Sequence, residues 1–218
     1  MNKKERYAYI IDYFSTHNPN AKSELQYKSA YELLVAVILS AQCTDKRVNM
    51  TTPLFFKQYP TPDLLAKAAI NDIYEIIKSI SYPNNKAKHL SGMAHTLMQD
   101  FNGIVPDNME DLQKLPGVGR KTANVVISVF FNKAAMPVDT HVFRVAARIG
   151  LSNQAKTPLE TEKQLVQNIP EHLLSKAHHW LILHGRYTCV ARKPKCETCG
   201  ITTACKYYQN LSKKEVIS

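Results

Sequence analysis

Four of the five cysteines lie close together near the end of the chain, at a spacing that suits one shared metal centre. They are Cys189, Cys196, Cys199 and Cys205, with six, two and five residues between them, whereas Cys43 lies far away. Cysteine thiolates are soft ligands that bind iron-sulfur clusters or zinc. Structural zinc sites more often pair two short hooks, and here only Cys196 and Cys199 form one. Disulfides are the remaining alternative, and they require an oxidising compartment.

A glycine-rich turn followed by a lysine, LPGVGRKTA at residues 115–123, is the second feature that suggests chemistry. Gly117 and Gly119 permit a very tight turn, and we expect Val118 between them to anchor it in the core. The helix that begins after this turn offers unpaired amides and a positive dipole end, which bind phosphate without regard to base sequence. Lys121 lies close to that end, where a neutral amine is favoured and can attack carbon. A plain phosphate contact by Lys121 is the alternative.

Asp139 is a candidate partner for this lysine, since it stands where an amphipathic helix is expected to begin. Its ordinary role at such a position is to cap the helix by accepting hydrogen bonds from the first amides. The capping role and a catalytic role can coexist. Arg144 and Arg148 lie one turn apart on the same segment. The side chains expected to face the core are Val142, Phe143, Val145, Ala146 and Ile149.

The charge balance favours a polyanionic partner. Lys and Arg outnumber Asp and Glu by 28 to 18, which gives a net charge of +10 and a sequence pI near 9.3. Clustered cations gain free energy by displacing counterions from phosphates, although many basic proteins bind no nucleic acid. The amino terminus lacks the apolar core of a signal peptide, and the longest apolar run, residues 33–39, is far shorter than the roughly 20 residues that cross a bilayer. We therefore expect a cytoplasmic protein, which disfavours disulfides.

The elements that position these groups are expected to be helices almost throughout. Apolar residues recur at helical rather than alternating spacing, and no clear strand emerges. Ser29 with Glu32, Thr157 with Glu160, and Thr61 before a proline are residue types that begin helices. The sequence predicts about ten short helices, with turns at Tyr59-Pro60, residues 82–85, Asn102-Gly103 and Met136-Pro137.

Several long strings in a fixed order make the chain similar to one known family. They are ELLVAVILSAQCTD near the front, then LPGVGRKTANVV, VDTHVFRVAARIGL and HHWLILHGRYTC, followed by the four-cysteine spacing. On these strings the chain resembles endonuclease III, of the helix-hairpin-helix DNA glycosylase superfamily, over nearly its whole length. The resemblance implies an all-α fold of two helical lobes. Residues 22–133 would form a helical barrel with the helix-hairpin-helix motif, and residues 1–21 plus 134–218 would carry an iron-sulfur cluster loop.

The resemblance also implies an activity and a cofactor. The family removes oxidised pyrimidines from damaged double-stranded DNA in base excision repair, after turning the damaged nucleotide out of the duplex. By matching position, Lys121 would attack C1′ of the deoxyribose and form a Schiff base, and β-elimination would then nick the strand 3′ to the abasic site. Asp139 would stabilise positive charge on the sugar and help to activate the amine. The four cysteines would hold one 4Fe-4S cluster per chain, with a mainly structural role, in a monomeric enzyme.

The same resemblance assigns DNA contacts outside the reacting centre. Gln42 would fill the gap left by the extruded nucleotide, and a surface glutamine at a helix end is the alternative. Ile80 and Tyr82 lie in the region that wedges into the base stack in relatives. Ser81 and Pro83 depart from the family pattern there, so the resemblance does not set the loop shape, the lesion range or the opposite-base preference. The other implied contacts are Gly117, Val118, Gly119, Arg120, Thr122, His141, Arg144, Arg192, Lys193 and Lys195.

Two other functions compete with this interpretation. An adenine-removing mismatch glycosylase of the same superfamily shares the cluster and the hairpin, but it lacks a lysine at the position of Lys121. A non-catalytic DNA-binding protein that uses its cluster for redox sensing would keep the basic surface without the covalent chemistry. Borohydride trapping on DNA separates these functions, because only an enzyme that forms a Schiff base becomes covalently attached.

Overall fold

The computed structural model describes residues 1–215, and every regular element in this range is a helix. The predicted all-α fold class is therefore confirmed, with twelve α-helices and three short 3-10 helices in that range. The chain forms two compact units: a continuous unit, Ser23–Lys133, and a discontinuous unit made of Met1–Lys22 with Ala134–Ser218. These bounds differ from the expected ones only at Lys22. Within residues 1–215 no helix is both long and apolar enough to cross a membrane.

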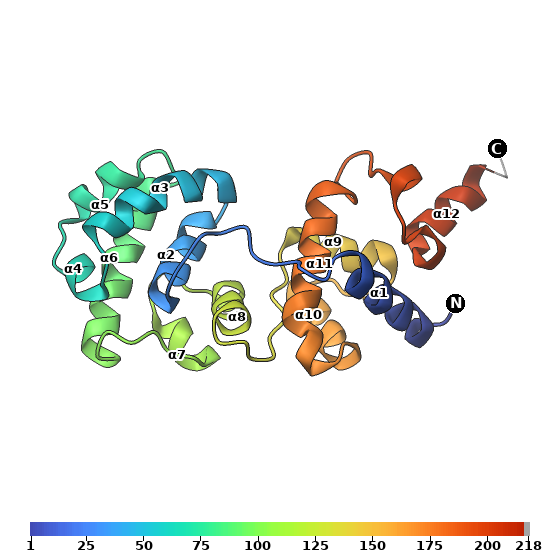
Figure 1. Ribbon diagram of the computed structural model, residues 1–218, viewed down its shortest axis with the longest axis horizontal. Coiled ribbons are helices and arrows are strands. Elements are labelled where there is room, and N and C mark those ends of the chain that lie inside the picture. Colours follow the sequence, from blue (N-terminus) through green and yellow to red (C-terminus); the bar gives the residue numbers. More distant parts are fainter. Residues whose placement is uncertain (216–218) are drawn as a thin grey trace. The chain divides into compact units, whose positions relative to one another are not determined.

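The continuous unit is organised around α2 and α6 (Figure 1). α2 packs against α3, α6 and α8, while α6 also packs against α4 and α5, and α7 packs against α8. Every helix of this unit therefore contacts α2, α6 or α8. The bounds are α2 Ala30–Ser40, α3 Asp45–Gln58, α4 Pro62–Ala66, α5 Ile70–Ile77, α6 Pro83–Asp100, α7 Met109–Lys114 and α8 Arg120–Val129.

The apolar run identified in the sequence forms the centre of this unit's core. All residues from Leu33 to Leu39 of α2 are buried, together with Ile73 of α5 and Leu90 of α6. Each fully buried leucine or isoleucine contributes roughly 1.5–3 kcal/mol relative to an exposed one. α2 is thus held firmly in place, and so is the short loop that follows its last residue, Ser40.

The turn predicted at residues 82–85 is wrong beyond Tyr82, because Pro83 begins α6. Proline is tolerated in the first turn of a helix, where its missing N–H would have no helical partner in any case. The sequence signal therefore marks the start of a helix and not a break between two helices. As a result, Asn84, Asn85 and Lys86 belong to the first turns of α6.

The discontinuous unit joins the amino-terminal helix to the last third of the chain. α9 packs against α10, α11 and α12, and α1 packs against the 3-10 helix η3. Phe14 of α1 and Trp180 of α11 stack in the shared core, and Trp180 Nε1 donates to the Asn18 carbonyl at 2.9 Å. The bounds are α1 Lys3–His17, α9 Thr140–Ile149, α10 Pro158–Asn168, η1 Glu171–Leu173, α11 Leu174–Tyr187, η2 Cys196–Thr198, η3 Thr202–Ala204 and α12 Lys206–Glu215.

Helices begin where the capping signals in the sequence predict. The side chains of Ser29, Thr61 and Thr157 each accept a hydrogen bond from the amide three residues further on. In a capping box, a glutamate three residues after the cap also accepts a hydrogen bond from a backbone amide at the helix start. Glu32 and Glu160 do this, but each accepts from the amide of the residue before the cap and not from the cap residue itself. Amides at these helix starts therefore find side-chain partners supplied by the local sequence.

Candidate functional site

The glycine-rich turn links α7 to α8 and forms the predicted helix-hairpin-helix motif. Gly117 has a φ of 82°, in the left-handed region that glycine enters without strain, and a Cβ there would lie 2.8 Å from the Cβ of His89. Gly119 has a φ of −86°, and a Cβ there would meet nothing within 4 Å. Gly117 therefore shapes the turn, whereas Gly119 leaves the space in front of α8 open.

Val118 packs inward and anchors the turn in the core. Its side chain is 6% exposed, and its amide donates to the Leu115 carbonyl at 3.0 Å within the turn. The predicted anchoring role of Val118 is confirmed, and its predicted DNA contact stays a prediction.

The start of α8 has the character of an anion site. Among the described residues no side chain caps this helix, because its cap position is Gly119. The first amides and the positive end of the helix dipole therefore face the open space in front of the turn. Arg120 and Lys121 are exposed in the first turn, and Thr122 beside them is half-buried. The predicted hairpin residues, apart from Val118, thus gather at one helix end.

Asp139 caps α9, as its position in the sequence predicts. Its Oδ1 accepts hydrogen bonds from the amides of His141 and Val142 at 2.9 and 2.8 Å. Within residues 1–215 no hydrogen bond involves Oδ2, so this oxygen of the half-buried carboxylate keeps its capacity to accept. Asp139 belongs to the discontinuous unit and Lys121 to the continuous unit, and each is fixed within its own unit.

Arg144 has a structural role within the discontinuous unit, and its predicted DNA contact stays a prediction. Its guanidinium donates to the carbonyls of Gly185 and Cys189 at 2.8 and 3.2 Å and also contacts the Thr140 carbonyl. It further donates to Nδ1 of His141 at 3.2 Å. Because a guanidinium only donates, Nδ1 of His141 is the acceptor and Nε2 carries the ring proton. Most donors of Arg144 are therefore occupied, and His141 keeps a donor for DNA.

The four cysteines near the end of the chain line one pocket in the discontinuous unit. Three of them are half-buried, and Cys205 is buried. Burial raises the pKa of the Cys199 and Cys205 thiols, and the neighbouring sulfurs raise both further. Thiolates this close repel one another unless a cationic centre shares them. The pocket therefore suits a positively charged group that displaces the thiol protons on binding.

The four cysteines are compatible with an iron-sulfur cluster. Within the described part of the chain, no group of three or more His, Cys, Asp or Glu side chains is arranged to hold one metal ion. The sulfurs instead surround a pocket that is also lined by Ile149, Ile201 and Tyr207. Cysteine thiolates are the ligands of iron-sulfur clusters, and they also bind structural zinc. The residues present are therefore compatible with such a group.

Arg148 supports the cysteine loop, and we did not assign it this role from the sequence. It donates to the carbonyls of Val190 and Ala191 at 2.7 and 2.8 Å, and its Nη1 lies 3.5 Å from Cys189 Sγ. These bonds fix the chain just after the first cysteine. The signal in the sequence was its position one turn after Arg144, which places both arginines on one face of α9.

His184 is a second supporting residue that the sequence did not reveal. Its Nε2 lies 3.8 Å from Cys199 Sγ, and burial lowers the pKa of His184 to about 4. The ring is therefore neutral near pH 7, and in the tautomer that carries its hydrogen on Nε2 it can donate a hydrogen bond to the sulfur. Nothing in the spacing of a histidine five residues before the first cysteine distinguishes it from His178 or His179.

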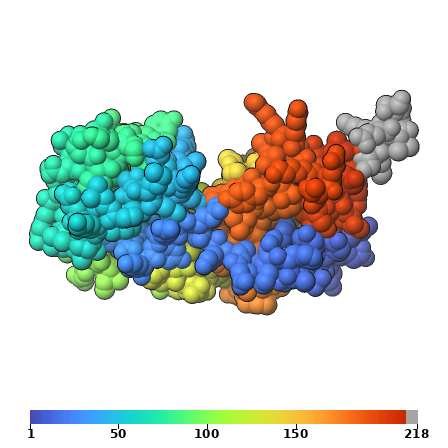
Figure 2. Space-filling model, turned by 45° about the horizontal axis from the view of Figure 1, so that its top comes forward, coloured from blue at the N-terminus to red at the C-terminus, as the bar shows by residue number. Residues whose placement is uncertain are grey.

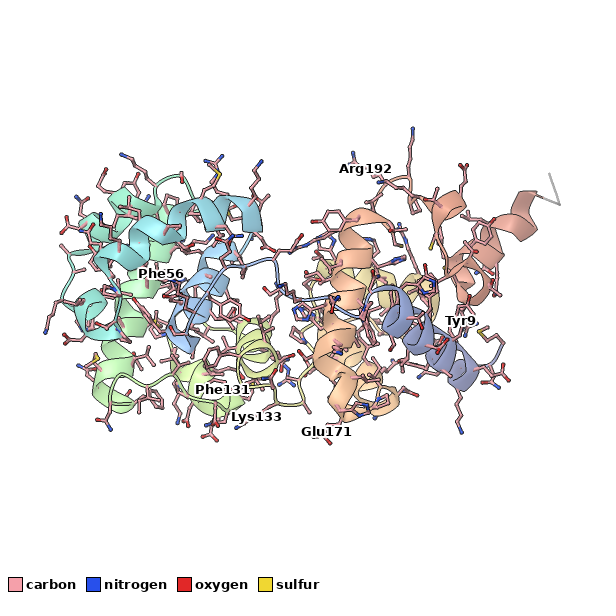
Figure 3. All side chains as sticks on the ribbon, in the orientation of Figure 1. Tyr9, Phe56, Phe131, Lys133, Glu171 and Arg192 are labelled. Carbon is pink, nitrogen blue, oxygen red and sulfur yellow. The ribbon has the colours of Figure 1, made fainter. Side chains whose placement is uncertain are left out.

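The segment between the first two cysteines presents positive charge. Arg192, Lys193 and Lys195 are all exposed, and Figure 3 shows Arg192 directed away from the body of the discontinuous unit. Side chains of the same orange segment protrude in Figure 2. The amide of Lys195 donates to the Thr188 carbonyl at 3.0 Å and closes the loop. Three cations therefore lie on a backbone that is held at both ends.

Gln42 and Tyr82 share an unusual backbone conformation. Gln42 follows α2 with a φ of 54°, and Tyr82 precedes α6 with a φ of 56°. Both are exposed, and Tyr82 presents 61% of its surface. The left-handed region costs a non-glycine residue roughly 1–2 kcal/mol and persists only where surrounding structure enforces it. The two residues predicted to enter DNA are therefore held in strained conformations at the surface of the continuous unit.

Ile80 does not share this surface, because its side chain is buried, and the DNA contact predicted for it stays a prediction. Its side chain is 2% exposed, and its amide donates to the Ile77 carbonyl at 2.8 Å. Exposing such a side chain would cost roughly 1.5–3 kcal/mol. Ile80 instead anchors the segment that carries Tyr82.

Comparison with known proteins places these features in one class. A family model described as HhH-GPD superfamily base excision DNA repair protein matches residues 35–171. The chain is 50% identical to endonuclease III of Rickettsia conorii, over 93% of this chain and 96% of that protein. A solved structure of a trapped endonuclease III–DNA covalent intermediate matches with a TM-score of 0.92 and 40% identity, over 97% of this chain and 100% of that one. A thermostable thymine-DNA glycosylase matches with a TM-score of 0.84 and 26% identity, over 95% and 97%.

The fold, the hairpin and these similarities define a base excision DNA repair protein of the HhH-GPD superfamily. Within this superfamily the chain belongs to the endonuclease III family, as its sequence strings predicted. It is therefore an enzyme, and its class is that of the DNA glycosylases.

Proposed function

We propose that this glycosylase removes oxidised pyrimidines from double-stranded DNA and cuts the strand through a Schiff base on Lys121, acting as a monomer in the cytoplasm. The observation that carries the proposal is the exposed lysine in the first turn of α8, behind a turn shaped by Gly117 and beside uncapped amides. The similarity to an endonuclease III that was trapped as a covalent intermediate with DNA supports the same chemistry here.

DNA binding precedes chemistry in this proposal. The amides at the start of α8 take a phosphate, and the cations of the cysteine loop take others, so affinity does not depend on base sequence. The damaged nucleotide must leave the stack, because C1′ of its sugar is unreachable inside the duplex. Gln42 would occupy the vacated space and hydrogen-bond the orphaned base, and Tyr82 would wedge beside it.

The amine of Lys121 then acts as the nucleophile. As the neutral form, Nζ bonds to C1′ while the bond from C1′ to the base nitrogen breaks, and the base leaves with the electron pair and gains a proton. The carboxylate of Asp139 stabilises the positive charge that develops on the sugar and accepts a proton from the amine. The nitrogen lone pair then forms a double bond to C1′ while the bond from C1′ to the ring oxygen breaks; the oxygen keeps that electron pair and gains a proton, which leaves a protonated Schiff base between Nζ and C1′.

The Schiff base makes strand cleavage possible. Its positive nitrogen acidifies the C2′ proton, and removal of that proton places its electron pair in a new double bond between C2′ and C3′. The bond from C3′ to oxygen breaks, and the 3′ phosphate leaves with the electrons. Water then hydrolyses the imine, which releases an unsaturated aldehyde on the DNA and restores Lys121. The strand is cut 3′ to the abasic site.

We further propose that Cys189, Cys196, Cys199 and Cys205 hold one 4Fe-4S cluster per chain. When bound, the cluster would cross-link the cysteine loop and so fix the cations between the first two ligands. We expect iron and acid-labile sulfide at about four atoms each per chain in wild-type protein. Cys196→Ser should lower both, whereas Cys43→Ser should change neither. Stoichiometric zinc without iron in the wild type would contradict this assignment.

Borohydride trapping tests the catalytic proposal. Wild-type protein should be trapped on a duplex that contains thymine glycol, and Lys121→Ala should lower trapping at least about a hundredfold. The variant should still bind a duplex with a non-cleavable abasic analogue, because the amides of α8 remain. Lys114→Ala, which removes an exposed lysine from the preceding helix, should trap as the wild type does.

Two results would contradict the proposal. Base release without any trapping would exclude the lysine as nucleophile. Activity only on thymine in a G·T mismatch, the kind of substrate suggested by the similarity to a thymine-DNA glycosylase, would overturn the assignment of oxidised pyrimidines.

A further inference from the structure

The loops that carry Gln42 and Tyr82 are joined by one buried lysine. Nζ of Lys86 donates to the carbonyls of Leu39 and Ala41, each at 2.7 Å. The amide of the same residue donates to the Tyr82 carbonyl at 3.2 Å. Lys86 therefore touches the residue just before Gln42 and also Tyr82 itself. Two segments about forty residues apart in the chain therefore meet at this one residue, one through its side chain and the other through its backbone amide in the first turn of α6.

The contacts of Lys86 satisfy the carboxyl end of α2. The last carbonyls of a helix have no partner within it, and a cation at that end is favourable to the helix dipole. Leu39 lies in the last turn of α2, and Ala41 is its C-cap. The ammonium group thus fixes the direction in which the chain leaves α2. That direction decides where Gln42, the next residue, is presented.

Packing alone does not account for a lysine at this position. Lys86 is 5% exposed, and burial lowers the pKa of its amine, so a buried ammonium is unfavourable without compensating bonds. Methionine would fill a similar volume without this penalty. Only lysine supplies an ammonium group at the end of a long side chain, and this group donates to two carbonyls at the carboxyl end of α2.

Both loops need such a restraint. Gln42 and Tyr82 have φ values of 54° and 56°, a region in which non-glycine residues stay only when their surroundings hold them. On its other side the Tyr82 loop is anchored by the fully buried Ile80. The Gln42 loop is short, since α2 ends at Ser40 and α3 begins at Asp45. Because Lys86 is bonded to both segments, it holds the Gln42 loop and the Tyr82 loop in a fixed position relative to each other.

We propose that Lys86 is a positioning residue that couples the Gln42 and Tyr82 loops, so that both side chains enter the duplex together when the damaged nucleotide is turned out. This inference rests on the proposed function, because it assigns DNA insertion to those two loops. It predicts that losing the ammonium impairs extrusion and the capture of the orphaned base. The chemistry at Lys121 should remain intact wherever extrusion is not needed.

The test compares a duplex substrate with a single strand. Lys86→Met should lower single-turnover excision of thymine glycol from a duplex about tenfold or more. Trapping on a preformed abasic site in a single-stranded oligonucleotide should stay within about twofold of the wild type, because no base pair has to open there. Lys88→Met, which removes an exposed lysine from the same helix, should leave both rates unchanged.

A second readout does not depend on catalysis. 2-Aminopurine placed opposite a non-cleavable abasic analogue should brighten when wild-type protein unstacks it, and Lys86→Met should lose most of this increase. Lys86→Met should also add little to the defect of a Gln42→Ala, Tyr82→Ala double variant, because it acts through those residues. Should Lys86→Met lose the helical circular dichroism spectrum, Lys86→Gln replaces it, with the same direction and a smaller effect.

The outcomes separate this inference from the proposed function. Wild-type fluorescence with Lys86→Met would overturn the positioning role, and so would an equal loss on duplex and single strand, which indicates a general structural defect. If wild-type protein traps on neither DNA, the proposed chemistry fails, while the fluorescence experiment still decides the role of Lys86.

Discussion

At the scale of single residues, Asp139 has two functions that substitution can separate. Its Oδ1 caps α9, and its negative charge is proposed to act on the sugar and the amine. Asparagine keeps an oxygen that can cap the helix but has no charge, whereas alanine has neither.

We therefore predict that Asp139→Asn folds with nearly wild-type stability and loses about a hundredfold or more in excision rate. Asp139→Ala should lose a similar rate and also about 1 kcal/mol in the free energy of unfolding. Single-turnover kinetics and urea titration measure the two effects. Equal stability of both variants would contradict the capping role, and full activity of Asp139→Asn would contradict the charge role.

At the scale of elements, the hairpin uses its two glycines for different purposes. Gly117 needs a positive φ and has His89 against the place of a Cβ, so it is required by the fold of the continuous unit. Gly119 has an ordinary extended φ and open space in front of it, so the chain itself does not require it.

We predict that Gly117→Ala lowers the free energy of unfolding by about 1 kcal/mol or more, because both the backbone and the His89 contact are strained. Gly119→Ala should leave stability nearly unchanged and weaken DNA binding about tenfold, since its methyl group occupies the space that a phosphate would approach. Thermal unfolding and fluorescence anisotropy measure these effects. Normal DNA affinity in Gly119→Ala would show that no phosphate approaches the start of α8.

At the scale of the whole molecule, the net charge of +10 matters for DNA binding only where the cations are exposed and not already paired with carboxylates. Arg192, Lys193 and Lys195 lie on one loop that is fixed at both ends. Elsewhere, lysines such as Lys67 and Lys78 already pair with neighbouring carboxylates, so they offer less to a phosphate.

We predict that replacing Arg192, Lys193 and Lys195 by Gln reduces the slope of log Kd against log salt concentration by about 2 to 3, one for each lost phosphate contact. The same change at Lys67 and Lys78 should leave the slope unaltered. Anisotropy titrations at several salt concentrations measure it. An unaltered slope in the loop variant would mean that this loop does not contact DNA.

Local signals in the sequence determined most of the fold. Helix starts at Ser29, Thr61, Thr157 and Asp139 follow from side chains that satisfy nearby amides, which needs only a few neighbouring residues. Helical spacing of apolar residues determined the all-α class. The four cysteines and the hairpin lysine were visible because their chemistry depends on residue type and short spacing.

Tertiary structure alone decided which of the candidate residues are free to act. Ile80 and Val118 are occupied by the core, and Arg144 by the carbonyls of α11 and the residue that begins the cysteine loop. Lys86 and Arg148 belong to no motif that identifies a partner in the sequence, yet they bind carbonyls more than forty residues away. Burial and hydrogen bonding between distant segments depend on how the helices pack, and no local pattern records that. The sequence therefore determined which reactive and charged residue types are present, and packing decided which of their side chains are exposed and can act.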